Sequence, residues 1–255
     1  MATLNRDGVQ IYYEVTGDHG PVVLLSHGYG LTSQMWEGQR PALAGCRTIV
    51  WDMRGHGRSD SPADPAQYSQ ALTVGDMAAL LDVVGEPKAV VAGLSLGGYM
   101  SLAFHAIHPQ RVRALMLFDT GPGFRSDAAR GDWNKYAESR ATMLERDGLS
   151  ALGKGAEARV SGEHSAQGLA HAARGMLVQA DASVIDSLPH IAVPTLVLVG
   201  AQDKNYLAGT DYMAGKIAGA HKVVIEGAGH TANLDQPQAF NRVVQEFLLT
   251  LAAGE

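Results

Sequence analysis

The chain has 255 residues, of which 46% are hydrophobic and 18% charged, as in a typical folded globular protein. Its formal net charge of −6, with Lys and Arg scattered along the chain, argues against nucleic acid or an anionic membrane surface as partner. A single cysteine, Cys46, excludes an internal disulfide and a multi-cysteine metal site. The N-terminus lacks a signal-peptide pattern and no apolar run reaches about 18 residues, so we expect a soluble, cytoplasmic protein.

The first 120 residues alternate between strand-like and helix-like segments. Apolar or alternating runs predict strands at Val9–Val15, Val22–Ser26, Arg47–Trp51, Lys88–Leu94 and Arg113–Asp119. Helical spacing between them predicts helices at Ser33–Ala44, Thr73–Val84 and Leu96–His108. This alternation predicts a mainly parallel sheet with helices on both faces.

The alternation stops between Gly121 and about His190. In this stretch Asp132 is the expected N-cap of a helix that ends at Gly148, and shorter helices are expected near Leu149–Val160, Ser165–Leu177 and Ala182–Leu188. Roughly 70 residues are too many for a structureless loop inside a compact domain. We therefore expect residues 121–190 to form a helical cap inserted between two parts of one core, residues 1–120 and 191–255.

Strand and helix alternate again after the expected cap. The predicted elements are a strand at Thr195–Gly200, a helix at Tyr206–Ala218, a strand at Lys222–Glu226 and a helix at Pro237–Ala252. In a parallel sheet, ligands bind beyond the carboxyl ends of the strands, so the polar residues that follow these strands are candidate site residues.

One such residue is Ser95, in Gly93-Leu94-Ser95-Leu96-Gly97, directly between an apolar strand and a helix. So sharp a turn forces the serine into a strained conformation and leaves its hydroxyl exposed at the tip. Gly93 and Gly97 are expected where a side chain would clash between strand and helix. The sequence therefore predicts a nucleophile elbow, against the competing interpretation of a glycine-rich turn without chemistry.

A serine nucleophile needs a neighbouring base that a third group orients. His230 is the favoured base, because it follows the last strand in a loop whose glycines let its ring turn toward Ser95. His56 fits a polar network that shapes a loop, and His27 fits a bracing role. The helical histidines, His105 and His108, lack a third ligand at metal spacing, so no metal is expected.

Two aspartates compete as the orienting acid. Asp203 ends the strand before that of His230, which gives the chain order Ser, Asp, His. Asp119 ends the strand after the elbow and is the alternative, although it leads into the expected cap. The backbone N–H groups of Leu96, at the helix start, and Tyr29, in His27-Gly28-Tyr29-Gly30, are the expected oxyanion donors.

These motifs together resemble the α/β-hydrolase superfamily over nearly the whole core. The residues that carry the resemblance are His27-Gly-x-Gly, Asp52-x-Arg-Gly-His-Gly-x-Ser59, Gly-Leu-Ser95-Leu-Gly-Gly, Asp203 and Gly-His230. The elbow and the Asp52–Ser59 loop are similar to those of 3-oxoadipate enol-lactonases and small bacterial carboxylesterases. The resemblance implies an eight-stranded sheet, a helical cap and a Ser95–His230–Asp203 triad that uses no cofactor. Subgroups with an aspartate nucleophile are disfavoured because Ser95 occupies that position.

The leading functional hypothesis is hydrolysis of a small carboxylic ester or lactone through an acyl-enzyme on Ser95. One alternative keeps the triad for C–C bond hydrolysis, perhydrolysis or lyase chemistry, and another is a ligand-binding protein that turns over very slowly. Oligomeric state and natural substrate stay open. Apolar cap residues that can line a pocket, or equally pack the cap on the core, are Phe124, Trp133, Met143, Met176 and Leu177.

Overall fold

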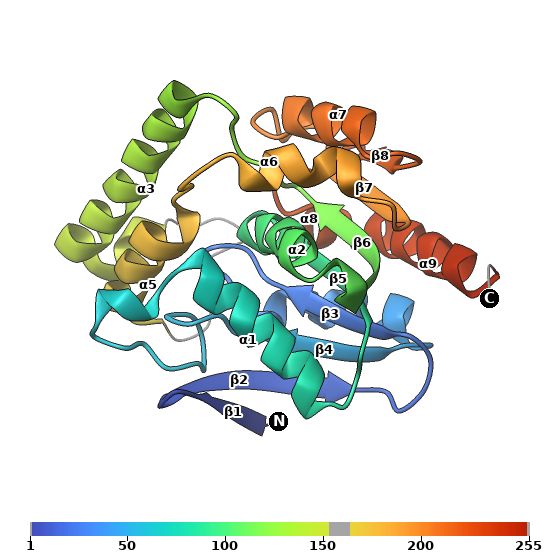
Figure 1. Cartoon of the computed structure of the whole chain (residues 1–255), viewed down its shortest axis with the longest axis horizontal. Coiled ribbons are helices and arrows are strands. Elements are labelled where there is room, and N and C mark those ends of the chain that lie inside the picture. Colours follow the sequence, from blue (N-terminus) through green and yellow to red (C-terminus); the bar gives the residue numbers. More distant parts are fainter. Residues whose placement is uncertain (1, 153–163, 254–255) are drawn as a thin grey trace.

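The computed structural model describes residues 2–152 and 164–253. An eight-stranded sheet runs through it in the order β1-β2-β4-β3-β5-β6-β7-β8 (Figure 1). Strands β3 to β8 are parallel, whereas β1 and β2 pair antiparallel at one edge. The strands are β1 (Ala2–Arg6), β2 (Val9–Thr16), β3 (Val22–Ser26), β4 (Arg47–Trp51), β5 (Ala89–Leu94), β6 (Val112–Phe118), β7 (Thr195–Gly200) and β8 (His221–Ile225).

This sheet confirms the predicted fold class, and it adds β1, which the sequence reading did not predict. The β1 strand joins β2 through a tight turn in which Asp7 and Gly8 both have positive φ, 54° and 91°. Its residues are mostly exposed, so they lack the apolar run that marks the buried strands.

Helices cover both faces of the sheet. They are α1 (Gln70–Val83), α2 (Leu96–Ile107), α7 (Leu207–Lys216), α8 (Ala232–Asp235), α9 (Pro237–Ala253) and the 3₁₀ segments η1 (Ser33–Leu43), η2 (Pro65–Gln67) and η3 (Pro109–Arg111). Side chains on either side of each strand enter different cores: Val91 packs with α1 and α2, and its neighbour Val90 packs with η1 and α9. Figure 1 shows α1 and α2 side by side on one face.

The helix predicted at Ser33–Ala44 is the 3₁₀ segment η1, Ser33–Leu43, rather than an α-helix. Pro41 lies within it and has no N–H to donate, and its ring clashes with the carbonyl four residues earlier in an α-helix. The 3₁₀ geometry still buries Met35 and Trp36 against the sheet.

A block of helices without strands lies between β6 and β7. It comprises α3 (Asp127–Asp147), η4 (Gly148–Leu152), α5 (Ala166–Ala172), the π-helical turn η5 (Ala173–Leu177), α6 (Ser183–Ser187) and η6 (Leu188–His190). The N-cap predicted at Asp132 is wrong: α3 begins at Asp127, and the Ser126 hydroxyl caps it by accepting from Ala129 N over 3.1 Å. The helix predicted near residues 149–160 lies largely outside the described residues. Figure 1 shows α3 beside α5, to the left of α2. We propose that residues 121–190 form one unit and keep the name cap for it.

Within residues 2–152 and 164–253, no helix is both long enough and apolar enough to cross a membrane.

Candidate active site

The turn from β5 into α2 holds Ser95 in a strained conformation. Its φ of 54° and ψ of −115° lie where side chains are disfavoured, and the Ser95 N–H is fixed by the Phe118 carbonyl of β6 at 2.9 Å. A Cβ on Gly93 would lie 2.3 Å from the Gly97 carbonyl carbon, and one on Gly97 would lie 2.2 Å from the Ser26 carbonyl oxygen. Only glycine fits at these two positions, so the strand and helix approach closely enough to expose the serine.

Ser95, His230 and Asp203 form one hydrogen-bonded chain. The distance from Ser95 Oγ to His230 Nε2 is 2.9 Å, and that from His230 Nδ1 to Asp203 Oδ2 is 2.7 Å. These residues follow β5, β8 and β7, whose carboxyl ends meet at one edge of the parallel sheet. The Asp203 side chain is 4% exposed and that of His230 is 32% exposed, so the acid is shielded while the imidazole reaches the open side of the site.

Asp119, the alternative acid, makes other bonds. Its Oδ1 accepts from Gly200 N over 2.8 Å and its Oδ2 accepts from Ala232 N over 3.2 Å. Burial raises the pKa of Asp119 to about 7, although the two backbone N–H groups and nearby His230 act in the opposite direction. Asp119 therefore ties the end of β7 to the start of α8, and no hydrogen bond joins it to His230 among the described residues.

The two amides expected to hold an oxyanion flank the serine. Leu96 is the first residue of α2, and Tyr29 lies in the turn closed by Leu31 N donating to Gly28 O over 3.1 Å. Within residues 2–152 and 164–253, no protein acceptor takes either the Leu96 or the Tyr29 N–H. Both donors are thus available to a ligand.

Histidines other than His230 brace the loop that carries Tyr29. His27 donates from Nδ1 to Gly28 O over 2.7 Å and accepts at Nε2 from Met53 N over 2.9 Å. His164, just before α5, contacts Gly30 O over 3.2 Å and Gly57 N over 3.0 Å. Burial lowers the pKa of His27, of His56 and, to about 4, of His164, so these rings stay neutral at pH 7. The contacts of His27 fit the bracing role predicted for it, and His56, predicted to belong to a polar network that shapes a loop, bonds through Nδ1 to Arg54 O over 3.0 Å.

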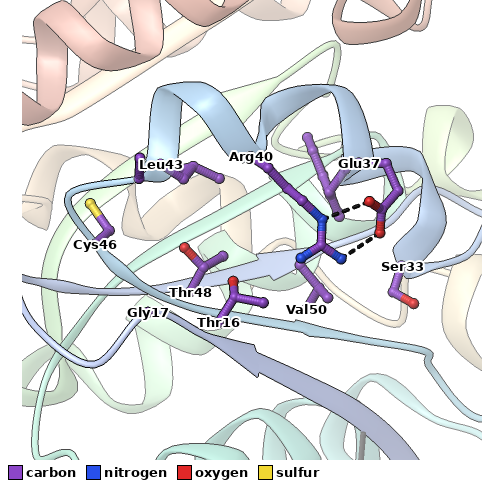
Figure 2. A pocket seen from close by; sticks show the side chains of 11 residues that line it. Thr16, Gly17, Ser33, Glu37, Arg40, Leu43, Cys46, Thr48 and Val50 are labelled. Atoms are coloured by element: carbon purple, nitrogen blue, oxygen red, sulfur yellow. Dashed lines mark hydrogen bonds and ion pairs between the residues drawn. The ribbon is translucent and has the colours of Figure 1, made fainter.

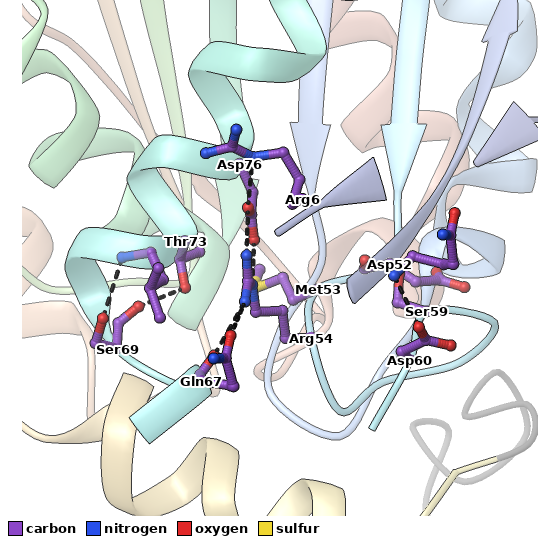
Figure 3. Close-up of polar contacts among 12 residues, drawn as sticks. Arg6, Asp52, Met53, Arg54, Ser59, Asp60, Gln67, Ser69, Thr73 and Asp76 are labelled. Atoms are coloured by element: carbon purple, nitrogen blue, oxygen red, sulfur yellow. Dashed lines mark hydrogen bonds and ion pairs between the residues drawn. The ribbon is translucent and has the colours of Figure 1, made fainter. Parts of the chain in front are cut away.

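Polar contacts of the Asp52–Ser59 motif hold the neighbouring loop in place (Figure 3). Asp52 accepts from Ser33 N over 2.7 Å and from Arg58 N over 2.9 Å, while Arg54 forms two bonds to Asp76 of α1 at 2.7 and 2.9 Å. Arg54 and Asp76 are both buried, and Asp76 also accepts from Arg6 Nε over 3.2 Å, so removing Asp76 would leave the buried Arg54 charge without a carboxylate partner. The motif thus fixes the loop next to the oxyanion turn.

Tyr206 completes the site and was missed by the sequence reading. Its ring stacks on His230 with 4.8 Å between centroids and 20° between planes, and its N–H donates to Asp203 O over 3.0 Å. Burial raises the Tyr206 pKa to about 12, while a hydrogen bond with Ser95 acts to lower it. The available sequence signal was an aromatic residue three positions after Asp203, at the start of a helix.

The predicted pocket residues separate into two groups. Phe124 and Trp133 lie together, with ring centroids 6.1 Å apart, and the Trp133 indole N–H donates to Leu177 O over 2.6 Å. Met176 has no exposed surface and belongs with Leu177 to the packing of helices against the core, so Met176 does not line an open pocket here. Met143 on α3 is half-buried.

A separate pocket of about 140 Å³ lies under η1, on the other face of the sheet from α1 and α2 (Figure 2). This pocket is lined by the Glu37–Arg40 ion pair and by the only cysteine of the chain, Cys46. Burial raises the pKa of Cys46, which keeps the thiol protonated and a poor nucleophile. Within the described ranges, no group of three or more His, Cys, Asp or Glu side chains is placed to hold a metal ion.

Comparisons with known proteins identify the family and the fold of the chain. A family model described as the alpha/beta hydrolase fold matches residues 21–153, slightly more than half of the chain. A 3-oxoadipate enol-lactonase of Acinetobacter baylyi is 29% identical over 95% of this chain and 94% of its own length. A Bacillus subtilis protein assigned as a 2-succinyl-6-hydroxy-2,4-cyclohexadiene-1-carboxylate synthase is 29% identical over 98% of this chain and 100% of its own. The solved structure of a thermophilic esterase from Thermogutta terrifontis superimposes with a TM-score of 0.83 at 29% identity, covering 98% of this chain and 97% of the esterase.

Proposed function

The chain belongs to the α/β-hydrolase family, and we propose that it is a serine hydrolase that cleaves a small carboxylic ester or lactone. The hydrogen-bonded chain Ser95–His230–Asp203 carries the proposal, because a serine hydroxyl is a competent nucleophile only when a base can take its proton. Relatives that include an esterase and an enol-lactonase support the same reaction class.

In the proposed reaction Ser95 Oγ attacks the ester carbonyl carbon and gives its proton to His230 Nε2. Asp203 then stabilises the imidazolium through the bond to Nδ1. The carbonyl oxygen becomes an oxyanion held by the Leu96 and Tyr29 N–H groups. As the tetrahedral intermediate collapses, His230 returns the proton to the leaving alkoxide, and an acyl group stays on Ser95.

A water molecule completes the cycle. It attacks the acyl carbon while His230 accepts its proton, and His230 then returns that proton to Ser95 Oγ as the bond to the acyl carbon breaks and the acid product is released. With a lactone, the alkoxide and the acid belong to one molecule, so one hydroxy acid or its tautomer is released.

Labelling and mutation test the nucleophile together. A fluorophosphonate probe should attach to the peptide that contains Ser95, and Ser95→Ala should lose both the label and turnover of short p-nitrophenyl esters. Ser101 lies further along α2 and donates to Gly97 O over 2.8 Å, so Ser101→Ala is a matched control that keeps the proposed triad. Turnover by Ser95→Ala above a few per cent of wild type would refute the mechanism.

Lyase chemistry with the same three residues is the second candidate, favoured by the full-length match to a protein assigned as a synthase. The two reactions differ in their intermediate, because ester hydrolysis passes through an acyl-enzyme and an elimination does not. Mass spectrometry of the enzyme quenched during turnover of a slow ester should detect an acyl group on Ser95. Turnover without any acyl-enzyme would favour the lyase.

A further inference from the structure

Within the described part of the cap, residues 121–152 and 164–190, Arg140 is a half-buried positive charge that has no partner. The other arginines described in residues 121–190 each pair with a carboxylate: Arg125, Arg130, Arg146 and Arg174. Arg140, in the middle of α3, is half-buried and forms no ion pair or hydrogen bond with the rest of the described chain. Taking a guanidinium partly out of water without a partner costs free energy, so its retention calls for a ligand.

Arg140 lies along one edge of the buried face of α3. That face is formed by Ala137, Ala141 and Leu144, which recur at three- and four-residue spacing. Arg140 is one helical turn from Tyr136, whose ring is 5.3 Å from that of Trp133. These three side chains therefore share an edge of the helix.

The acidic side chains on the opposite edge of α3 are already paired with an arginine. Arg174 of η5 bonds there to Glu138 and Glu145, with distances of 2.7 Å between Arg174 Nη2 and Glu138 Oε1 and 3.0 Å between Nη2 and Glu145 Oε2. Because Glu138 and Glu145 are held by Arg174, they are directed away from the edge that carries Arg140.

The α3 helix, which carries Arg140, packs on α5, and α5 contacts the turn that carries Tyr29. The Tyr29 hydroxyl donates to Leu169 O of α5 over 2.7 Å, so its ring reaches from the oxyanion turn up to the cap. Burial raises the pKa of Tyr29; among the weaker influences, the charge of Arg140 lowers it and Tyr136 raises it further. Tyr136 also acts on Tyr206, the residue that stacks on His230. The charge of Arg140 thus acts on Tyr29, and Tyr136, one helical turn before Arg140, acts on both Tyr29 and Tyr206.

We propose that Arg140 binds a carboxylate of the substrate, so that the preferred substrates are esters or lactones that also carry a free carboxylate. This rests on the proposed ester hydrolysis. A guanidinium presents a planar fork of N–H donors that matches the two oxygens of a carboxylate. Arg140 is then a specificity residue on the cap, while the proposed chemistry stays with Ser95 and His230.

Paired esters of equal length test this proposal. Monomethyl glutarate and methyl pentanoate differ in having a terminal carboxylate or a methyl group, and hydrolysis of each at pH 8 is followed by titration. The wild type should have the higher kcat/KM for monomethyl glutarate, and Arg140→Gln should lower the ratio of the two kcat/KM values about 10- to 100-fold, the range expected of a charge-assisted hydrogen bond. Most of that loss should appear in KM, and Arg140→Lys should recover part of it. A series from monomethyl succinate to monomethyl suberate then gives the reach from Ser95 to Arg140.

Arg146→Gln is the matched control, because Arg146 lies on the same helix, is largely exposed and pairs with Asp147. It should leave the ratio at the wild-type value. A ratio unchanged in Arg140→Gln, with methyl pentanoate still hydrolysed, would overturn the role of Arg140 and leave the proposed function standing. If the wild type hydrolyses neither ester, the proposed function fails, and calorimetric binding of glutarate decides Arg140 separately. Glutarate should bind the wild type at least tenfold more tightly than it binds Arg140→Gln. Equal binding to the two proteins would refute a carboxylate site. Inorganic phosphate that competes for the site as strongly as glutarate would refute it as well.

Discussion

Replacing each of the two competing aspartates by asparagine tests which one orients His230. Asp203 Oδ2 accepts from His230 Nδ1 over 2.7 Å, and that bond keeps the lone pair of the imidazole on Nε2, facing Ser95. An amide at position 203 can present its NH₂ group to Nδ1, which moves the ring proton to Nε2 and removes the base. We expect Asp203→Asn to lower kcat about 10⁴-fold, or about 5.5 kcal/mol of transition-state stabilisation.

Asp119→Asn should act on stability instead. The amide oxygen can still accept from either Gly200 N or Ala232 N, but not from both with the present geometry. At pH 5, where the raised pKa keeps Asp119 protonated in the folded state, losing one buried hydrogen bond costs about 1–2 kcal/mol, which lowers Tm by about 2–4 °C for each kcal/mol in a domain of this size. We expect kcat to fall by less than about fivefold.

The assay combines steady-state hydrolysis of p-nitrophenyl butyrate at pH 8 with thermal unfolding of each variant. Asp211→Asn serves as control, because Asp211 is an exposed carboxylate of α7 that pairs with Lys222. If Asp119→Asn lowers kcat more than Asp203→Asn does at equal Tm, then Asp119, which follows β6, is the residue that orients His230. Retention of a tenth of wild-type kcat by Asp203→Asn would equally refute the assignment.

Three further outcomes follow from the same geometry. Ser95→Gly should unfold at a Tm a few degrees above that of Ser95→Ala, because glycine relieves backbone strain of about 1–3 kcal/mol at φ 54°; equal Tm values would argue against strain. The raised pKa of Asp119, about 7, means that the folded state keeps a proton that the unfolded state loses above its ordinary pKa near 4. The contribution of Asp119 to the free energy of unfolding is therefore fully present below about pH 4 and is lost as the pH rises to about 7, by up to about 4 kcal/mol. Between pH 5 and pH 8, the free energy of unfolding measured in urea should fall more for wild type than for Asp119→Asn. Tyr206→Leu should lower kcat about 2- to 10-fold, as expected for one aromatic stacking contact, and Tyr206→Phe should retain the part due to the ring; identical kinetics in both variants would show that stacking on His230 has no role.

Local signals in the sequence were enough for the elbow and for most of the sheet. Gly93 and Gly97 mark the elbow because the backbone clearance there admits no side chain, a constraint that acts within a few residues. Apolar runs located the parallel strands because those strands are buried on both faces. The exposed β1 strand and the start of α3 at Ser126 escaped prediction, since an exposed edge strand lacks such a run and Asp132 offered an equally good capping side chain.

Contacts between distant segments settled what local signals left open. Chain order favoured Asp203 over Asp119; in the structure Asp203 bonds to His230, while Asp119 accepts from the backbone N–H groups of Gly200 and Ala232. Neither the stacking of Tyr206 on His230 nor the absence of a partner for Arg140 within residues 2–152 and 164–253 has any local signature. Each depends on which side chains from other elements come within a few ångströms. The sequence by itself determined most of the parallel strands and the sharp turn at Ser95. The tertiary structure decided the partners, because hydrogen bonds and ion pairs form between groups that only the parallel register of β5, β7 and β8 and the packing of α3 on α5 bring together.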